Sequence, residues 1–518
     1  MSHARRLACA LLVLIIGGSL WGGCYGPSPS AGGGQTKVAD TGTAARHINP
    51  ADIALPPGFR IEAVARDLTY PSGVCFDEQN RPCVVEAGYS YGESFTTPRL
   101  LRVGGDGAVT QVAAGDNSGP WNGVAFHDGA FYVSQGGVMT GGRIARITTD
   151  GKIAHLVSNL PSVGDHHVNG PVVTRDGQLY FSIGVATNSG VVGTDSYKFG
   201  WLQRHPEFCD VPPRDIKLTG ENFTSDNPLT PGKPDKAVTG AYMPFGQRSE
   251  AGQVIRGKTP GTGTIYRMAI GAGARQATTR QAPNQGAPAK LELVAWGLRN
   301  PFGLALAPDI QLYVTENQFD DRGSRPVWGT GDLLWKIALG TWYGWPDFHG
   351  DHPLAHDHFQ PPGKAQPKFL LAEHPNKPPK PAAILGVHSS ACGLDFSRSE
   401  QFGFPGEAFV AVFGDMSPSV GKVMGPVGFR VLRVNVNDGT IETFATNRGK
   451  KNGPASYLKS GGLERPVACK FDNSGKALYV VDFGVMTMGS KPQPKAGTGV
   501  LWRITRSSGG EAVSRREP

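Results

Sequence analysis

The sequence predicts an all-β protein, and three observations lead to that fold class. First, 72 of the 518 residues are Gly and 41 are Pro, together about 22% against roughly 12% in average proteins. Both residue types break helix interiors, which argues against a helical bundle. Second, 24 Phe, 13 Tyr and 9 Trp can fill a large core, which argues against a disordered chain. Third, short pairs of strands recur along the sequence.

The recurring unit is a small polar cluster, a Gly, a short strand, a turn, and a second strand that ends in acidic residues or Gly. Asp-Gly and Asn-rich turns between short strands are typical of β-hairpins. Inner hairpins are expected at 71–88, 121–137, 169–184, 300–317, 391–415 and 465–484. Outer strand pairs are expected at 99–113, 142–157, 264–270 with 290–296, and 429–445. Four strands make one blade, so the six inner hairpins predict a six-bladed β-propeller.

The two ends of the repeat region predict how the ring closes. The last hairpin is followed by one clear strand, 499–504, whereas a spare strand, 59–68, stands before the first hairpin. We expect the spare strand to become the outer strand of the sixth blade, which leaves few exposed sheet edges. A β-sandwich with coincidental hairpins is the alternative.

Long segments rich in Pro and Gly interrupt the repeats. They are residues 188–262, 318–331, 346–390, 415–428 and 485–498. Most of them follow the second strand of a blade, so we expect long loop insertions on one face of the propeller. Binding and catalytic residues are often carried by such loops.

The N-terminus reads as an export signal. Arg5 and Arg6 precede the apolar run 7–20, which ends at Gly22-Gly23-Cys24. Residues 1–24 are therefore predicted to be a signal peptide, with Cys24 in a context that resembles a bacterial lipobox; a plain cleaved signal and an uncleaved anchor are the alternatives. A flexible linker is expected over 25–46, the propeller over 47–506 and a disordered tail over 507–518. We therefore expect an exported protein, periplasmic or a cell-envelope lipoprotein attached to the membrane through Cys24.

Charge and cysteines narrow the function classes further. The net charge is +8, but acidic and basic residues are interspersed, which argues against nucleic-acid binding.

Cys75 and Cys83 are placed symmetrically about a turn and would face each other across an antiparallel strand pair. They are expected to be either a disulfide, which an exported protein can keep, or two buried thiols.

Polar residues just before each inner strand give the candidate site. In a propeller these positions ring the axis on one face, and here they include His, Arg and Asn. We expect the site to be lined by Asn122, His166, Asn169 and His388, together with His167, Arg299, Asn300 and Arg465. Two His clusters and two Arg around one axis suit an anionic ligand and proton transfer. The alternative is that these side chains only cap strands and satisfy turn backbone.

The same positions carry a family resemblance. Five motifs occur in the order His167-Val-Asn-Gly with Asp176-Gly-Gln-Leu-Tyr, Gly297-Leu-Arg-Asn-Pro-Phe-Gly303, Leu312-Tyr-Val-Thr-Glu-Asn317, Gly331-Asp332 and Tyr343-Gly-Trp-Pro346. The sequence in this respect resembles the quinoprotein glucose/sorbosone dehydrogenase family over roughly residues 50–506. Arg465 matches the second Arg of that family's Arg-x-Arg-Asp motif.

The resemblance implies an oxidoreductase that binds pyrroloquinoline quinone (PQQ) and Ca²⁺. It would oxidise an aldose-like or sorbosone-like sugar and pass electrons to an external acceptor. His167 would be the general base, taking the hydroxyl proton as hydride moves to the quinone. Arg299, Asn300, Arg465 and Lys422 would hold the cofactor, because Arg forks bind planar carboxylates bidentately.

The sequence also offers candidate metal ligands and two further hypotheses for the function. Glu316, Asp320 and Asp321 are the candidate Ca²⁺ ligands, since Ca²⁺ prefers oxygen. Leu463 and Pro466 stand where the family motif has Arg and Asp. This departure favours a second hypothesis, a non-catalytic propeller that binds carbohydrate or a partner protein. A Ca²⁺-dependent lactonase or hydrolase on the same scaffold is a third.

Overall fold

The fold is seen in a computed structural model, which describes residues 46–90, 94–116, 119–137, 141–270, 290–416, 425–487 and 492–507. The predicted signal peptide, Cys24, most of the predicted linker, Lys422 and the tail from residue 508 lie outside the described residues. Within those ranges, no helix is long and apolar enough to cross a membrane.

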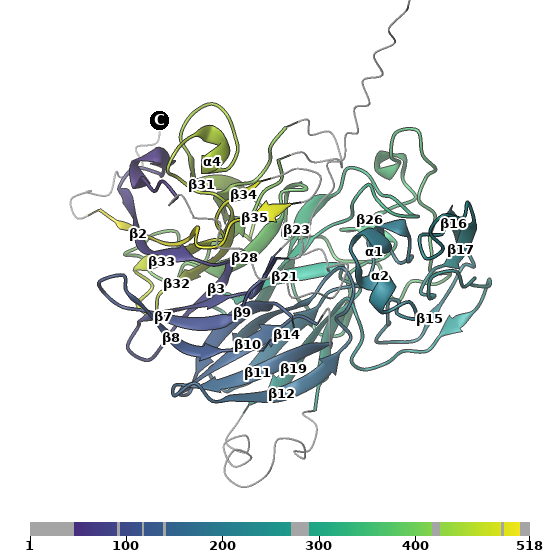
Figure 1. Ribbon diagram of the computed structural model, residues 1–518, viewed down its shortest axis with the longest axis horizontal. Helices are drawn as coiled ribbons and strands as arrows, with labels where there is room; N and C mark the ends of the chain where they lie inside the picture. Colours follow the sequence, from purple (N-terminus) through teal and green to yellow (C-terminus); the bar gives the residue numbers. More distant parts are fainter. Residues whose placement is uncertain are drawn as a thin grey trace, which may run out of the picture.

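Six antiparallel sheets surround one axis, as predicted (Figure 1). From the axis outward, the first blade is β3 (Pro71–Phe76), β4 (Pro82–Glu86), β7 (Arg99–Val103) and β8 (Val109–Ala114). The second blade is β9 (Trp121–His127), β10 (Ala130–Gln135), β11 (Gly142–Thr148) and β12 (Ile153–Leu160). The third blade is β13 (Val168–Val173), β14 (Gln178–Ile183), β19 (Thr264–Ala269) and β20 (Glu292–Trp296). The fourth blade is β21 (Asn300–Leu306), β22 (Leu312–Asn317), β23 (Gly331–Lys336) and β27 (Ala383–Val387). The fifth blade is β28 (Ala391–Phe396), β29 (Ala408–Val412), β30 (Arg430–Val434) and β31 (Ile441–Asn447). The sixth blade is β32 (Pro466–Phe471), β33 (Ala477–Asp482), β36 (Gly499–Arg506) and β2 (Phe59–Leu68).

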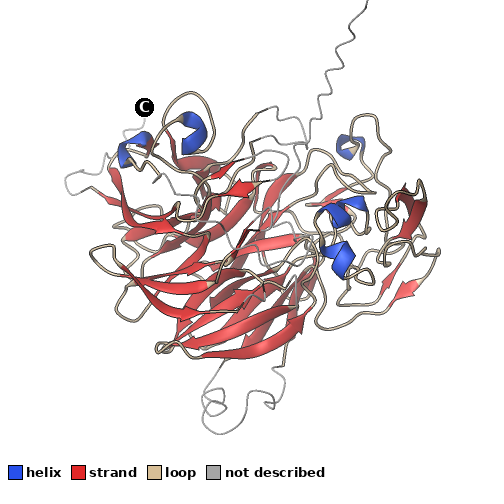
Figure 2. Ribbon diagram, viewed as in Figure 1, coloured by secondary structure: helices blue, strands red, loops and turns tan. Residues whose placement is uncertain are grey.

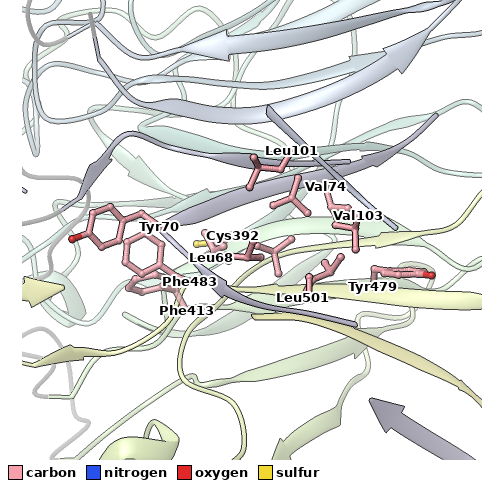
Figure 3. Packing of buried hydrophobic residues seen from close by; sticks show 14 of the residues in the cluster. Leu68, Tyr70, Val74, Leu101, Val103, Cys392, Phe413, Tyr479, Phe483 and Leu501 are labelled. Carbon is pink, nitrogen blue, oxygen red and sulfur yellow. The ribbon is translucent and has the colours of Figure 1, made fainter. Parts of the chain in front are cut away.

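The ring closes through the spare N-terminal strand, which confirms that prediction. β2 pairs antiparallel with β36 along its length, from Phe59 opposite Arg506 to Leu68 opposite Gly499. Figure 3 shows the core at this joint, where Leu68 and Val74 of the chain's start lie with Phe483 and Leu501 of its end. Tyr70 stacks on Phe483 with ring centroids 5.5 Å apart, so apolar burial holds the two ends of the chain together.

The glycine of the repeat allows the inner strands to approach one another at the axis. A Cβ added to Gly73 would lie 3.0 Å from Gly123 Cα, and one added to Gly303 would lie 3.0 Å from Gly393 Cα. The sixth hairpin has Ala468 at this position, so the repeat of Gly is not complete. The Ala468 backbone still comes close to its neighbour, since a Cβ on Gly393 would lie 2.8 Å from Ala468 Cα.

Replacing Gly123 by Ala should therefore destabilise the ring. Its Cβ would lie 2.2 Å from the Gly170 carbonyl oxygen, which is backbone and cannot rotate away. We expect a loss of about 1–3 kcal/mol in the free energy of unfolding, measured by urea denaturation. Gly105→Ala is the control, because nothing lies within 4 Å of its added Cβ. Equal stability of the two variants would contradict this explanation of the repeat.

The predicted loop insertions form a packed side body rather than simple loops. Residues 184–263 carry α1 (Thr194–Lys198), α2 (Trp201–Arg204), β15 (Ile216–Lys217), β16 (Asn222–Asp226), β17 (Lys236–Gly240) and β18 (Val254–Ile255); residues 337–382 carry β24 (Thr341–Trp342), β25 (Phe348–His349), β26 (His352–Pro353) and η2 (Asp357–Phe359). In Figure 1 this insertion body lies to one side of the blades, and Figure 2 shows several of the few helices there. Leu218 and Trp345 belong to its shared hydrophobic core.

The fourth blade has outer strands that the sequence did not reveal. β23 and β27 pair antiparallel, although the insertion 337–382 separates them in the chain. Small elements elsewhere are η1 (Pro50–Asp52), β1 (Ile53–Ala54), β5 (Tyr89–Ser90), β6 (Ser94–Phe95), α4 (Ala455–Leu458), β34 (Met486–Thr487) and β35 (Gln493–Pro494).

The two cysteines of the first hairpin are opposite each other but are not bonded. Cys75 and Cys83 are register partners, as predicted, and both are free and buried. Cys83 Sγ lies 3.7 Å from the Arg81 carbonyl oxygen instead of bonding to Cys75. Burial raises the pKa of the Cys75 thiol and raises that of Cys83 to about 12. The disulfide alternative is therefore wrong for this structure, and the buried-thiol alternative holds.

Candidate active site

A polar cavity opens where the inner strands begin and the second strands end. These two positions meet because the two strands of each inner hairpin run antiparallel. The cavity has a volume of about 40 Å³ and is lined from four blades by His166, Arg299, Asn300, Asn317, Gln318, Asp320, Asp332, His388, Ser390, Phe413, Gly414, Asp415, Arg465 and Met486. The structure therefore brings together six predicted residues: His166, Arg299, Asn300, Asp320, His388 and Arg465.

His166 enters the cavity with its tautomer fixed. Its Nδ1 lies 2.9 Å from the Val185 carbonyl oxygen. A carbonyl can only accept, so Nδ1 carries the proton and Nε2 keeps a lone pair. Burial, and then the positive charges of Arg299 and Arg322, hold the pKa of His166 well below its usual range. His166 is therefore a neutral imidazole at neutral pH, and Nε2 is the nitrogen that can accept a proton.

His167 is not among the residues that line this cavity. It is 1% exposed and packs against Gly136, where an added Cβ would lie 3.0 Å from the ring. Neither ring nitrogen has a hydrogen-bond partner of good geometry in the part of the chain described. Burial lowers the pKa of His167 to about 4, opposed by a backbone contact with Ser162.

Arg299 is held by the protein itself. Its guanidinium donates to the Asn188 carbonyl and side-chain oxygens at 3.0 and 2.9 Å, to the Asn317 carbonyl at 3.2 Å and to Asp320 at 2.7 Å. Burial lowers the pKa of Arg299, and the carboxylate of Asp320 opposes that shift. The carboxylate-binding fork expected at this position is thus already occupied by protein oxygens.

Arg465 takes a different environment on the opposite side of the cavity. One Nη donates to the Gly414 carbonyl at 2.8 Å, and the guanidinium carbon lies 4.9 Å and 5.1 Å from the ring centroids of Phe413 and Phe429. Its backbone N–H donates to Asp482 at 2.8 Å. Aromatic contacts and the backbone bond together fix the guanidinium at the cavity wall.

His388 lies between two carboxylates. Its Nε2 is 3.0 Å from Asp320 Oδ1, and its Nδ1 is 3.0 Å from Asp415 Oδ2. The contact with Asp415 has the distance of an ion pair without hydrogen-bond geometry. This arrangement makes His388 a bridge between two walls of the cavity.

The predicted asparagines mainly tie blades together. Asn122 donates to the Val168 carbonyl at 2.8 Å, and Asn169 donates to the His167 and Pro301 carbonyls at 3.3 Å each. Neither lines the cavity. Asn300 does line it and donates to the Asn317 side chain at 3.1 Å.

The three candidate metal ligands are not brought together. Asp320 bonds to Arg299 and His388, whereas Asp321 forms an ion pair with Lys364 at 2.6 Å outside the cavity. Glu316 accepts from Trp335 Nε1 and from the Arg299 backbone N–H, and burial raises its pKa to about 7. Among the described residues, no three His, Cys, Asp or Glu side chains are grouped to hold a metal.

Several site residues were not predicted as such. Asp332 accepts from the Ala391 and Gln318 backbone N–H groups at 2.9 and 3.2 Å, and burial raises its pKa to about 6. Gln318 Oε1 is buried without a partner among the described residues. Asp415 follows the second strand of the fifth hairpin. The acidic endings of the repeat were a usable signal for Asp415. For Gln318 the signal was its departure from the family motif, since Gln318-Phe319 stands where the family has Gly-Pro after Glu-Asn.

The fold and the cavity define a six-bladed β-propeller with a buried polar site on its axis. No protein-family model and no curated protein matches the chain. A calcium structure of a Trichoderma reesei carbohydrate-active enzyme of family AA12 is similar with TM-score 0.53 and 16% identity, over 90% of this chain and all of that one. The holo form of the PQQ domain of a Coprinopsis cinerea pyranose dehydrogenase is similar with TM-score 0.53 and 14% identity, over 88% and 97% of the two chains. These likenesses show the propeller fold.

Proposed function

We propose that this protein is an exported quinone-dependent oxidoreductase that oxidises a sugar hydroxyl at the axial cavity. One observation carries the proposal: His166, with its lone pair fixed on Nε2, shares a buried cavity with Arg465 and Asn300. A base of fixed tautomer beside a guanidinium suits removal of a hydroxyl proton next to an anionic electron acceptor. The two similar structures, one a calcium structure and the other a PQQ domain, support the same class.

In this proposal His166 replaces His167 as the general base. The sequence motif favours His167, but His166 is the one that lines the cavity. His166 Nε2 would take the hydroxyl proton, and the Val185 carbonyl would hold the ring in place through Nδ1. Burial and the two nearby arginines lower the pKa of His166 and so keep the ring neutral before the reaction.

The cavity residues offer the kind of hydrogen-bond donors that a planar carboxylated quinone requires. Arg465 and Asn300 would hold it, with Lys422 as the further cofactor residue predicted from sequence. Arg299, already bonded internally, would support the wall through Asp320. When bound, PQQ would supply the hydride acceptor. Gln318 Oε1 and Asp332 are cavity oxygens that suit a sugar hydroxyl.

The cavity size limits how such a cofactor could enter. About 40 Å³ is room for a few water molecules. A three-ring cofactor does not fit inside this volume, so quinone binding at this cavity requires its walls to move apart.

A non-catalytic sugar-binding propeller is the second candidate. The observations that favour it are the internally bonded Arg299 and the three carboxylates, Asp320, Asp332 and Asp415, that line the cavity. These carboxylates disfavour an anionic cofactor, whereas neutral sugar hydroxyls can donate to them.

Reconstitution distinguishes these functions. Purified protein incubated with PQQ and Ca²⁺ should reduce a redox dye with at least one aldose, and omission of PQQ should abolish the reaction. Sugar binding without dye reduction would establish the second candidate instead. Lactone hydrolysis without quinone would point to the hydrolase that was the third hypothesis.

A further inference from the structure

Arg322 is one of the side chains through which the insertion body contacts the segments that line the cavity. Its Nε lies 2.8 Å from Asp320, its Nη1 lies 2.6 Å from Asp195 and its Nη2 lies 2.7 Å from Asp165. All three carboxylate side chains are at most 9% exposed, and Arg322 itself is 14% exposed. One guanidinium therefore pairs with three buried carboxylates in three separate segments.

Each carboxylate belongs to a different part of the molecule. Asp165 immediately precedes His166, Asp320 bonds to Arg299 and His388, and Asp195 lies in α1 of the insertion body. The insertion adds two more contacts, because Phe199 lies 4.4 Å under the Arg322 guanidinium and Trp201 donates to Asp165 at 2.6 Å. A substitution at Arg322 would therefore alter the contacts of Asp165, next to His166, and of Asp320, which bonds His388.

We propose that Arg322 is the positioning residue that makes the insertion body part of the active site, by fixing the segment that carries His166 and the Asp320–His388 pair. Arg322 does not line the cavity, so it acts through these neighbours. The catalytic consequence rests on the proposed function, whereas the structural coupling does not.

The test compares Arg322→Gln and Arg322→Lys with Arg325→Gln. Arg325 is an even more buried arginine that bonds Asp347 at 3.1 Å and the Pro346 carbonyl at 2.8 Å within the insertion body. In hydrogen exchange with mass spectrometry, Arg322→Gln should increase exchange at residues 163–170 and 194–204. Arg325→Gln should leave residues 163–170 unchanged. Lysine keeps the charge without the three-way fork, so Arg322→Lys should protect residues 163–170 in part.

Turnover supplies the second readout. Arg322→Gln should lower kcat at least tenfold while the KM for sugar changes less than threefold, with Arg322→Lys intermediate. Unchanged exchange at 163–170 in Arg322→Gln, or an equal change in Arg325→Gln, would overturn the coupling. If exchange changes as expected but wild-type protein has no turnover, the coupling stands and the proposed function fails.

Discussion

Replacing His166 by Asn should lower kcat for sugar oxidation by about 10²–10⁴-fold, the usual contribution of a general base. Asn can still donate to the Val185 carbonyl but has no basic nitrogen to take the hydroxyl proton. Quinone binding should change little, because Arg465 and Asn300 remain. Steady-state kinetics and a separate binding titration measure the two effects.

His167→Asn is the matched control, since it removes the neighbouring imidazole that packs against Gly136 instead of lining the cavity. It should retain most of the turnover. The reverse result, with turnover lost only in His167→Asn, would return the base to the residue that the sequence motif indicates.

The pH dependence of wild-type kcat/KM follows from the buried surroundings of His166. The pKa of His166 is held well below its usual range, mainly by burial, so the neutral, reactive form persists as the pH falls. The acid limb of kcat/KM should therefore lie below about pH 6.5, the ordinary His value.

Arg46→Met should destabilise the protein by about 3–5 kcal/mol, the usual cost of leaving a buried ion pair with one partner. Arg46 was expected at the end of the flexible linker, but its side chain is 3% exposed and lies 2.7 Å from Asp482, which is fully buried. It also donates to the Gly462 and Thr498 carbonyls at 2.6 and 2.9 Å. The folded body therefore includes Arg46, and this residue fastens the N-terminal segment to the sixth blade.

The consequence extends to the cavity, because Asp482 also accepts from the Arg465 backbone N–H at 2.8 Å. Urea denaturation measures the loss of stability. Arg60→Met is the control, since Arg60 is an exposed residue of β2 that bonds Thr505 at 3.1 Å. A stability loss below about 1 kcal/mol in Arg46→Met would show that this pair is no stronger than a surface contact.

The fold could be predicted because hairpins leave local signals. Asp-Gly turns, strand alternation and the axial glycines are read from adjacent residues, and the spare strand 59–68 had only one free edge to join. The outer pair β23 and β27 was missed because 46 residues lie between the strands, so no local turn links them. The packed insertion body was missed for a similar reason, since its core joins segments from two separate insertions.

The sequence predicted several of the positions that line the site, but not the contacts that their side chains make. Antiparallel hairpins place the residues before inner strands at one edge, which brought His166, Asn300, His388 and Arg465 together. Which histidine faces the cavity depends on strand register, and a bulge between Asn169 and Val172 interrupts it. The internal bonds of Arg299 come from Asn188 and Asp320, on loops without periodic pattern.

The central claim is that the axial cavity binds the quinone, and equilibrium titration with PQQ in Ca²⁺ tests it most directly. Quenching of intrinsic fluorescence should saturate at one quinone per chain. Arg465→Met should weaken that binding about tenfold or more, as loss of a charged hydrogen bond does. Arg267→Met, which removes an ion pair with Glu292 on an outer blade surface, should leave it unchanged. Absence of saturable binding, or equal affinity of the Arg465 variant and wild type, would contradict the account.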